Sequence, residues 1–261
     1  MLRHVGRQRE GGGTPGDKLG AMSAAFMSVT AFRNLCRSSP WRWQSLRFEL
    51  HHTGLATPAV HCWVRRPGAL RVEAPDGTLL AGTTGINASK GSLYISGSRK
   101  PWLLPPALVN PIKDDDGYVV RRPEALYGEP AYGTGRASAA LDPVELSGEH
   151  PVPLETPFAN PADVSAITAV SHYGRDAVEA ILTPGSSYRP VFADAPLLFP
   201  ARTKVRIDLE TGVCVAATSL EGPSQGAGHW MVLVAVNEYM PDELFESGID
   251  LPSPGLGGSW S

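Results

Sequence analysis

The chain has 261 residues, of which 42% are hydrophobic and 19% charged, and its formal net charge is -3. This composition is typical of a folded globular protein and excludes an intrinsically disordered chain. The near balance of basic and acidic residues disfavours a nucleic-acid partner, because phosphate binding needs an excess of positive charge. The 28 glycines and 24 prolines are typical of many short strands joined by turns.

The three cysteines and the apolar segments bear on the compartment. Cys36, Cys62 and Cys214 are widely spaced and form no C-x-x-C pair, which disfavours a disulfide framework and a thiolate zinc site. The longest apolar stretch, residues 21–32, is too short and too broken by hydroxyl residues to predict a transmembrane segment. Because the preceding residues also lack the features of a signal peptide, we expect a cytoplasmic protein.

The N-terminal part predicts a tail followed by a helix. Residues 1–21 are polar and glycine-rich, so we expect them to be disordered. Ser23 is a candidate helix cap, and the predicted helix runs to about Cys36 before Pro40. Its apolar face consists of residues spaced three or four apart: Phe26, Val29, Phe32 and Leu35.

Alternation of apolar and polar residues then predicts a β-meander. The pattern is clearest at Leu46, Phe48 and Leu50, which alternate with charged residues and histidine. Asp76-Gly77 is a strong hairpin signal. The predicted strands of this block cover 43–52, 60–66, 70–73, 78–82 and 91–97.

The region from about 100 to 165 holds many prolines and little periodicity, so it is predicted to be an irregular insert. One short strand is expected at 118–122 and a helical turn at 141–146. A loop of this length without any secondary structure is uncommon in a compact domain, so we expect short helices that pack over the sheet.

A second block of strands follows the insert. Strands are predicted over 165–172, 175–182, 203–209, 213–220 and 229–238, with a closing helical turn at 240–245. In the last strand we expect Trp230, Val232 and Val234 to share the buried face. Residues 22–246 are therefore predicted to form one domain, and 247–261 a flexible tail.

Three segments carry a resemblance to a known family: Trp63–Gly77 (WVRRPGALRVEAPDG), Lys204–Gly222 (KVRIDLETGVCVAATSLEG) and residues 240–245 (MPDELF). They resemble the lipoprotein-carrier superfamily of the LolA and LppX type, and more specifically uncharacterised actinobacterial LolA-like proteins. The resemblance implies a mainly β (α+β) fold. In that fold an incomplete antiparallel half-barrel holds an N-terminal helix and short helices of the insert in its concavity. It also implies a hydrophobic cavity.

The expected function is therefore that of a non-catalytic binding protein holding a hydrophobic small molecule or lipid in that cavity. No cofactor, metal or catalytic group is expected, and a protein partner is left open. The residues predicted to line the cavity are apolar strand residues: Leu46, Phe48, Leu50, Leu70, Val72, Val205, Ile207, Trp230, Val232 and Val234.

Two alternatives stay open. A small-molecule biosynthetic enzyme could use the same cavity, with His61, His172 or Glu179 as unranked acid–base groups. An interaction module with a filled core is the other, because a sequence does not distinguish a packed half-barrel from a hollow one. Trp43, Trp63, Trp102 and Trp230 fit either core packing or a cavity lining.

Other motifs carry little chemistry. His51 and His52 are adjacent on a predicted strand and point to opposite faces, so at most one of them can pair with His61, which disfavours a metal site. Asp114–Asp116 lack the spacing of an EF-hand loop and favour a solvated turn. Residues 171–175 (SHYGR) are predicted to be a hairpin turn, and residues 82–91 lack the spacing of a phosphate-binding loop.

Overall fold

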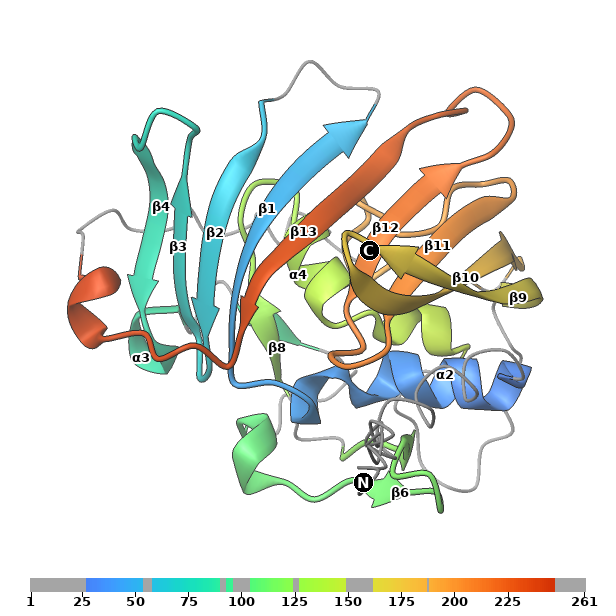
Figure 1. Ribbon diagram of the computed structural model, residues 1–261, viewed down its shortest axis with the longest axis horizontal. Helices are drawn as coiled ribbons and strands as arrows, with labels where there is room; N and C mark the ends of the chain where they lie inside the picture. The colour runs from blue at the N-terminus through green and yellow to red at the C-terminus, as the bar shows by residue number, and fades with distance from the viewer. Residues whose placement is uncertain are drawn as a thin grey trace, which may run out of the picture.

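The computed structural model describes residues 27–53, 58–89, 93–95, 104–123, 127–148, 162–186 and 188–246. Its main feature is one open antiparallel sheet of nine strands, with short helices packed on one face (Figure 1). The expectation of a mainly antiparallel β protein with few helices is thereby confirmed. The predicted tails, residues 1–21 and 247–261, lie outside the described residues.

The sheet consists of two meanders, and they are joined by pairing between the first strand of one and the last strand of the other. Its strand order is β4-β3-β2-β1-β13-β12-β11-β10-β9. The first meander comprises β1 (Ser45–Thr53), β2 (Val60–Arg65), β3 (Ala69–Glu73) and β4 (Leu79–Thr84). The second comprises β9 (Ala162–His172), β10 (Arg175–Pro184), β11 (Thr203–Asp208), β12 (Cys214–Ser219) and β13 (Gly228–Val236).

Pairing of β1 with β13 at the centre of the sheet determines where the insert runs. Because the first and last strands are neighbours, the chain leaves the sheet at the edge strand β4 and returns at the opposite edge strand β9. The residues between must therefore cross a face of the sheet, as Figure 1 shows for α4. Their elements are α3 (Ile86–Ser89), β5 (Leu93–Ile95), η2 (Pro106–Leu108), β6 (Ile112–Lys113), β7 (Val119–Arg121), β8 (Tyr127–Pro130), α4 (Arg136–Leu141) and η3 (Val144–Ser147).

The N-terminal helix, α2, spans Val29–Ser38 and continues into η1 (Ser39–Trp41). Its cap is Ser28, whose Oγ accepts a hydrogen bond of 3.1 Å from the backbone N–H of Ala31. The predicted cap Ser23 lies outside the described residues. Phe32 and Leu35 are fully buried, as their spacing indicated, and dock the helix on the sheet.

The hydrophobic core lies between the sheet and these helices. We call this helix-covered side the inner face and the opposite side the outer face. Alternation along β1 places Leu46, Phe48 and Leu50 on the inner face, each no more than 2% exposed. The outer face carries a small second cluster around Met240 and Phe245, next to η4 (Asp242–Leu244).

The strand β13 faces the other way from the prediction. Trp230 lies opposite the outer-face residue His51, and Val234 is 47% exposed. Trp230, Val232 and Val234 therefore belong to the outer face, and His229, Met231 and Leu233 are the buried residues. The strand is apolar on both sides over most of its length, so its sequence does not determine which side is buried.

No helix among the described residues combines the length and the hydropathy that a bilayer span requires.

Candidate functional site

Two histidines lie side by side at one end of the inner face. His52 of β1 and His229 of β13 are opposite each other in the antiparallel pairing. Side chains in that relation have Cβ atoms about 5 Å apart. Because His52 follows Leu50 by two residues and His229 precedes Met231 by two, both point to the inner face.

His229 is a neutral hydrogen-bonding group. Its side chain is only 1% exposed, and Nε2 donates a hydrogen bond of 3.0 Å to the carbonyl oxygen of Cys214. Burial and, to a smaller extent, the positive charge of Arg136 lower the pKa of His229 to about 3. The proton thus resides on Nε2 and Nδ1 carries a lone pair. Within the described part of the chain, Nδ1 is buried and has no hydrogen-bond partner.

Arg136 is the first residue of α4, and the chain passes tightly at this point. Gly135 has φ +86°, and a Cβ built there would lie 2.6 Å from the ring of Phe192. Glycine is therefore needed for α4 to begin beside Phe192. The guanidinium carbon of Arg136 lies 5.3 Å from the ring centroid of Phe199, where the cation can interact with the ring's π electrons.

The charge of Arg136 is poorly compensated. The residue is 9% exposed, and its Nη1 has no hydrogen-bond partner among the described residues. None of the ion pairs within 4.0 Å in that part of the chain involves it. Burial lowers the pKa of Arg136, as expected for a cation removed from water. A buried cation without a contacting anion is costly, so this arrangement calls for explanation.

Glu145 of η3 acts on Arg136 only at a distance. Its own oxygens are occupied: Tyr188 donates its hydroxyl proton at 2.6 Å, and the N–H groups of Val191 and Leu197 donate at 2.8 and 2.6 Å. Burial raises the pKa of Glu145, while these hydrogen bonds act against that shift. Glu145 therefore anchors the segment from Tyr188 to Leu197, and does not supply a direct partner for the guanidinium.

We call His52, His229 and Arg136 the inner polar cluster. Burial lowers the pKa of His52, and the charges of Arg136 and His51 lower it further. Arg136 thus acts electrostatically on both histidines. The three side chains come from β1, β13 and α4, which are distant in sequence. Together they present one cation and one unused imidazole acceptor next to an apolar core.

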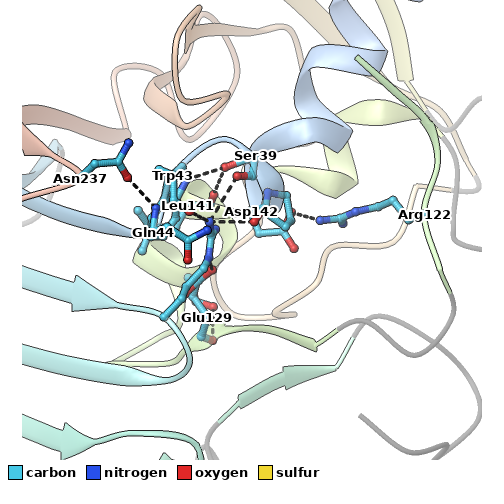
Figure 2. Close-up of polar contacts among 11 residues, drawn as sticks. Ser39, Trp43, Gln44, Arg122, Glu129, Leu141, Asp142 and Asn237 are labelled. Carbon is cyan, nitrogen blue, oxygen red and sulfur yellow. Dashed lines mark hydrogen bonds and ion pairs between the residues drawn. The ribbon is translucent and has the colours of Figure 1, made fainter. Parts of the chain in front are cut away.

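Arg66, Glu129, Arg122 and Asp142 form a separate group of buried charges, which we call the ion-pair cluster. Arg66 pairs with Glu129 at 2.7 Å and Arg122 with Asp142 at 2.6 Å, and all four side chains are almost fully buried. Arg66 also bonds the carbonyl oxygens of Pro40 and Trp43 and stacks on the Trp43 ring. Figure 2 shows this network, with Arg122 reaching Asp142.

The ion-pair cluster and the hydrogen bonds beside it join η1 to the insert. Ser39 Oγ donates to the carbonyl of Leu141 at 2.6 Å and accepts from Trp43 Nε1 at 3.0 Å (Figure 2). Arg66 Nη2, Arg122 Nε and Nη1, and Asp142 Oδ2 also have no hydrogen-bond partner among the described residues, but each arginine contacts its own carboxylate, so the charges cancel within the protein. We assign it a structural role: it holds the insert against η1 and the start of the sheet.

The predicted cavity residues divide between the two faces. Seven lie on the inner face within the main core cluster and are at most 4% exposed: Leu46, Phe48, Leu50, Leu70, Val72, Val205 and Ile207. Trp230, Val232 and Val234 lie on the outer face instead. On the outer face Trp230 is stacked between His51, at 3.5 Å between ring centroids, and the exposed Tyr173, at 5.4 Å. Trp43 is buried in the core, and Trp102 lies outside the described residues.

Two of the three unranked acid–base candidates come together on the outer face. Arg206 forms an ion pair of 2.8 Å with Glu179 and lies 3.4 Å from Nδ1 of His172. His172 Nε2 donates to the carbonyl of Met231 at 2.8 Å, so both ring nitrogens are engaged. His61 lies apart from them, with Nδ1 3.9 Å from a carboxylate oxygen of Glu49.

The remaining polar features are explained by local structure. Asp114 accepts hydrogen bonds from the side chain of Asn34 and the N–H of Tyr118, each at 2.8 Å, which makes 114–117 a structural turn. A surface hollow of about 440 Å³ lies between Gly174 and Glu210, and Arg175 in it is paired with Asp208 and Glu210. The described residues contain no group of three or more candidate metal ligands.

His229 and Arg136 were not among the predicted site residues. A signal for His229 existed in the alternation of β13, but it required the opposite choice of buried face. Arg136 carries no local signal, because its burial results from the path of the insert across the sheet. Comparison with known proteins gave no matching family model, and a search of curated proteins likewise found no match.

Proposed function

We propose that the protein is a non-catalytic binding protein that holds an amphipathic small molecule against the inner face of its sheet, at the inner polar cluster. The observation that carries this proposal is the buried guanidinium of Arg136, which has no contacting carboxylate within the described residues. His229, which lies opposite His52 on the neighbouring strand, adds a second buried atom: its acceptor Nδ1 has no hydrogen-bond partner among the described residues. Buried polar groups are normally satisfied, and a bound ligand would satisfy both.

The proposal differs from the sequence-based one in where the ligand lies. The seven inner-face residues first predicted as a lining already pack against helices, so a ligand at those positions would have to displace core side chains. The inner polar cluster lies at the end of β1, beyond Leu50. We therefore place the polar end of the ligand there.

The resemblance to LolA-like carriers, an incomplete half-barrel and a cytoplasmic location are parts of the same proposal. The open antiparallel sheet with helices on one face supports the first two. Three free, buried cysteines are compatible with a reducing compartment.

A binding role is favoured over catalysis by the acid–base properties of His229. A general base works best when its pKa lies near the working pH. The pKa of His229, lowered by burial to about 3, makes this side chain a weak base at neutral pH. It remains a good hydrogen-bond acceptor, which is what a binding site requires.

The test uses full-length protein from which bound small molecules have been extracted, titrated with the neutral apolar dye N-phenyl-1-naphthylamine. We expect a saturable rise in fluorescence. His52→Phe should weaken the binding, because it changes the inner face beside His229. His61→Phe is the matched control, since His61 is a strand histidine on the outer face. Dye binding that is absent from folded protein, or equally affected by both variants, would contradict the proposal.

A further inference from the structure

The inner polar cluster also indicates what kind of head group its ligand has. This inference rests on the proposed function, since it concerns the same site. The relevant groups are the ionisable side chains that act electrostatically on the members of the cluster. Besides His52 of β1, His229 of β13 and Arg136 of α4 themselves, they are Glu145 of η3, Tyr188, the thiol of Cys214 from β12, and the histidines His51 and His172.

Arg136 requires an acceptor, preferably a charged one. Its Nη1 is buried without a partner in the described residues, and Glu145 already receives three donors of its own. Carboxylates match the planar guanidinium and form hydrogen bonds about twice as strong as neutral pairs do. A dianionic phosphate would bring two negative charges to a single arginine beside Glu145. A monoanion therefore fits the local charge better.

His229 requires a donor. Nε2 is committed to the carbonyl of Cys214, so Nδ1 can only accept. Cys214 does not provide that donor, because its sulfur already donates to the carbonyl of Ala216 at 3.3 Å. A carboxylate alone would leave Nδ1 without a partner, whereas a hydroxyl group on the same ligand would satisfy it.

We infer that the ligand is a hydroxy acid with an apolar chain: its carboxylate bonds Arg136, and its hydroxyl donates to Nδ1 of His229. Binding would convert two unsatisfied buried atoms into one charge-assisted and one neutral hydrogen bond. A site built in this way rejects analogues that lack either group, because the loss leaves a protein atom desolvated and unpaired.

The experiment is calorimetric titration of the extracted full-length protein at pH 7 with octanoic acid, methyl octanoate, octyl phosphate, 2-hydroxyoctanoic acid and 3-hydroxyoctanoic acid. We expect octanoic acid to bind at least about 10-fold more tightly than its methyl ester, since only the acid pairs with Arg136. The better of the two hydroxy acids should bind about 5-fold or more tightly than octanoic acid. Arg136→Gln should abolish the first difference and His229→Phe the second. Arg202→Gln, a change to an exposed arginine paired with Glu221, should abolish neither.

Several outcomes would overturn the head-group assignment alone: an ester that binds as tightly as the acid, a preference for octyl phosphate, or a hydroxyl gain that persists in His229→Phe. Failure of every ligand, including the neutral dye and the ester, would instead overturn the proposed function. If His229→Phe does not fold, nitrogen NMR of the wild-type imidazole replaces it. Addition of the hydroxy acid should shift the Nδ1 resonance, and an unchanged resonance would show that Nδ1 is bound by water only.

Discussion

The buried cation of Arg136 lowers the free energy of unfolding of the ligand-free protein, and it provides a group that can bind a ligand. Removal of a charge that has no contacting partner relieves a desolvation cost, whereas removal of one member of an ion pair creates such a cost. The two situations occur in the same insert, because Arg122 is also buried but contacts Asp142 at 2.6 Å.

The first prediction compares methionine substitutions of these two arginines. We expect Arg136→Met to raise the free energy of unfolding of ligand-free protein by about 1 kcal/mol, and Arg122→Met to lower it by about 3 kcal/mol. Urea unfolding of the extracted proteins measures both. A large loss of stability in Arg136→Met would mean that its guanidinium is satisfied in the folded protein, contrary to the role given to it here.

The second prediction concerns the pH dependence of His229. Its folded-state pKa, lowered by burial to about 3, lies below the ordinary value of 6.5. Between these values the unfolded chain binds a proton that the folded protein does not. The titration of His229 therefore leaves the free energy of unfolding unchanged above pH 6.5. Below that pH it lowers the free energy of unfolding by about 1.4 kcal/mol per pH unit.

This slope is measured as a difference between wild type and His229→Gln, because Glu145 has a raised pKa and contributes with the opposite sign. Glutamine can keep a hydrogen bond to Cys214 but does not titrate. Unfolding at pH 7, 6 and 5 should show a shallower decline in the variant. Parallel pH profiles would show that His229 titrates normally.

At the scale of elements, the pairing of β12 with β13 leaves no room for a side chain at Gly228. Gly228 lies opposite Thr218, and a Cβ at this glycine would lie 1.8 Å from the carbonyl oxygen of Ala217. The obstacle is backbone, so it cannot be relieved by a side-chain rotation. The next residue, His229, pairs with Ala217 of β12.

The third prediction is that Gly228→Ala lowers the free energy of unfolding by about 3 kcal/mol, because the pairing of the two strands must open. Gly226→Ala is the matched control: its φ is +80° and nothing lies within 4 Å of the added Cβ. The control should cost only about 1 kcal/mol, the price of the left-handed backbone. Equal losses in chemical denaturation would contradict the close approach.

The same elements show what the sequence could and could not predict. Strands with one polar face, such as β1, were placed to within a few residues because their alternation is local information. The buried face of β13 is not predictable in this way, because Trp230, Val232 and Val234 are as apolar as Met231 and Leu233. The pairing of His52 with His229 depends on contact between β1 and β13, the first and last strands of the sheet in sequence. No short window of sequence contains that contact.

At the scale of the whole molecule, a buried ion pair holds the insert to the sheet. Arg66 directly follows β2, and its partner Glu129 lies in β8 of the insert. Burial raises the pKa of Glu129, and Arg66 opposes that shift. If this pair failed, α4 would lose one of its anchors and Arg136 its position.

The fourth prediction is a double-mutant cycle on this pair. Arg66→Met and Glu129→Met should each lower the free energy of unfolding by about 3 kcal/mol or more, because each leaves one buried charge without its partner. The double variant should be closer in stability to wild type than either single variant. Additive losses would show that the two charges do not interact in the folded protein.

The most direct test of the central claim is native mass spectrometry of the purified full-length protein, before and after denaturing extraction. We expect a bound mass of a few hundred daltons that is lost on extraction, and that is also missing from Arg136→Met purified in the same way. A wild-type protein that carries no such mass, and acquires none when incubated with the hydroxy acids above, would contradict the assignment of a ligand site to the inner polar cluster.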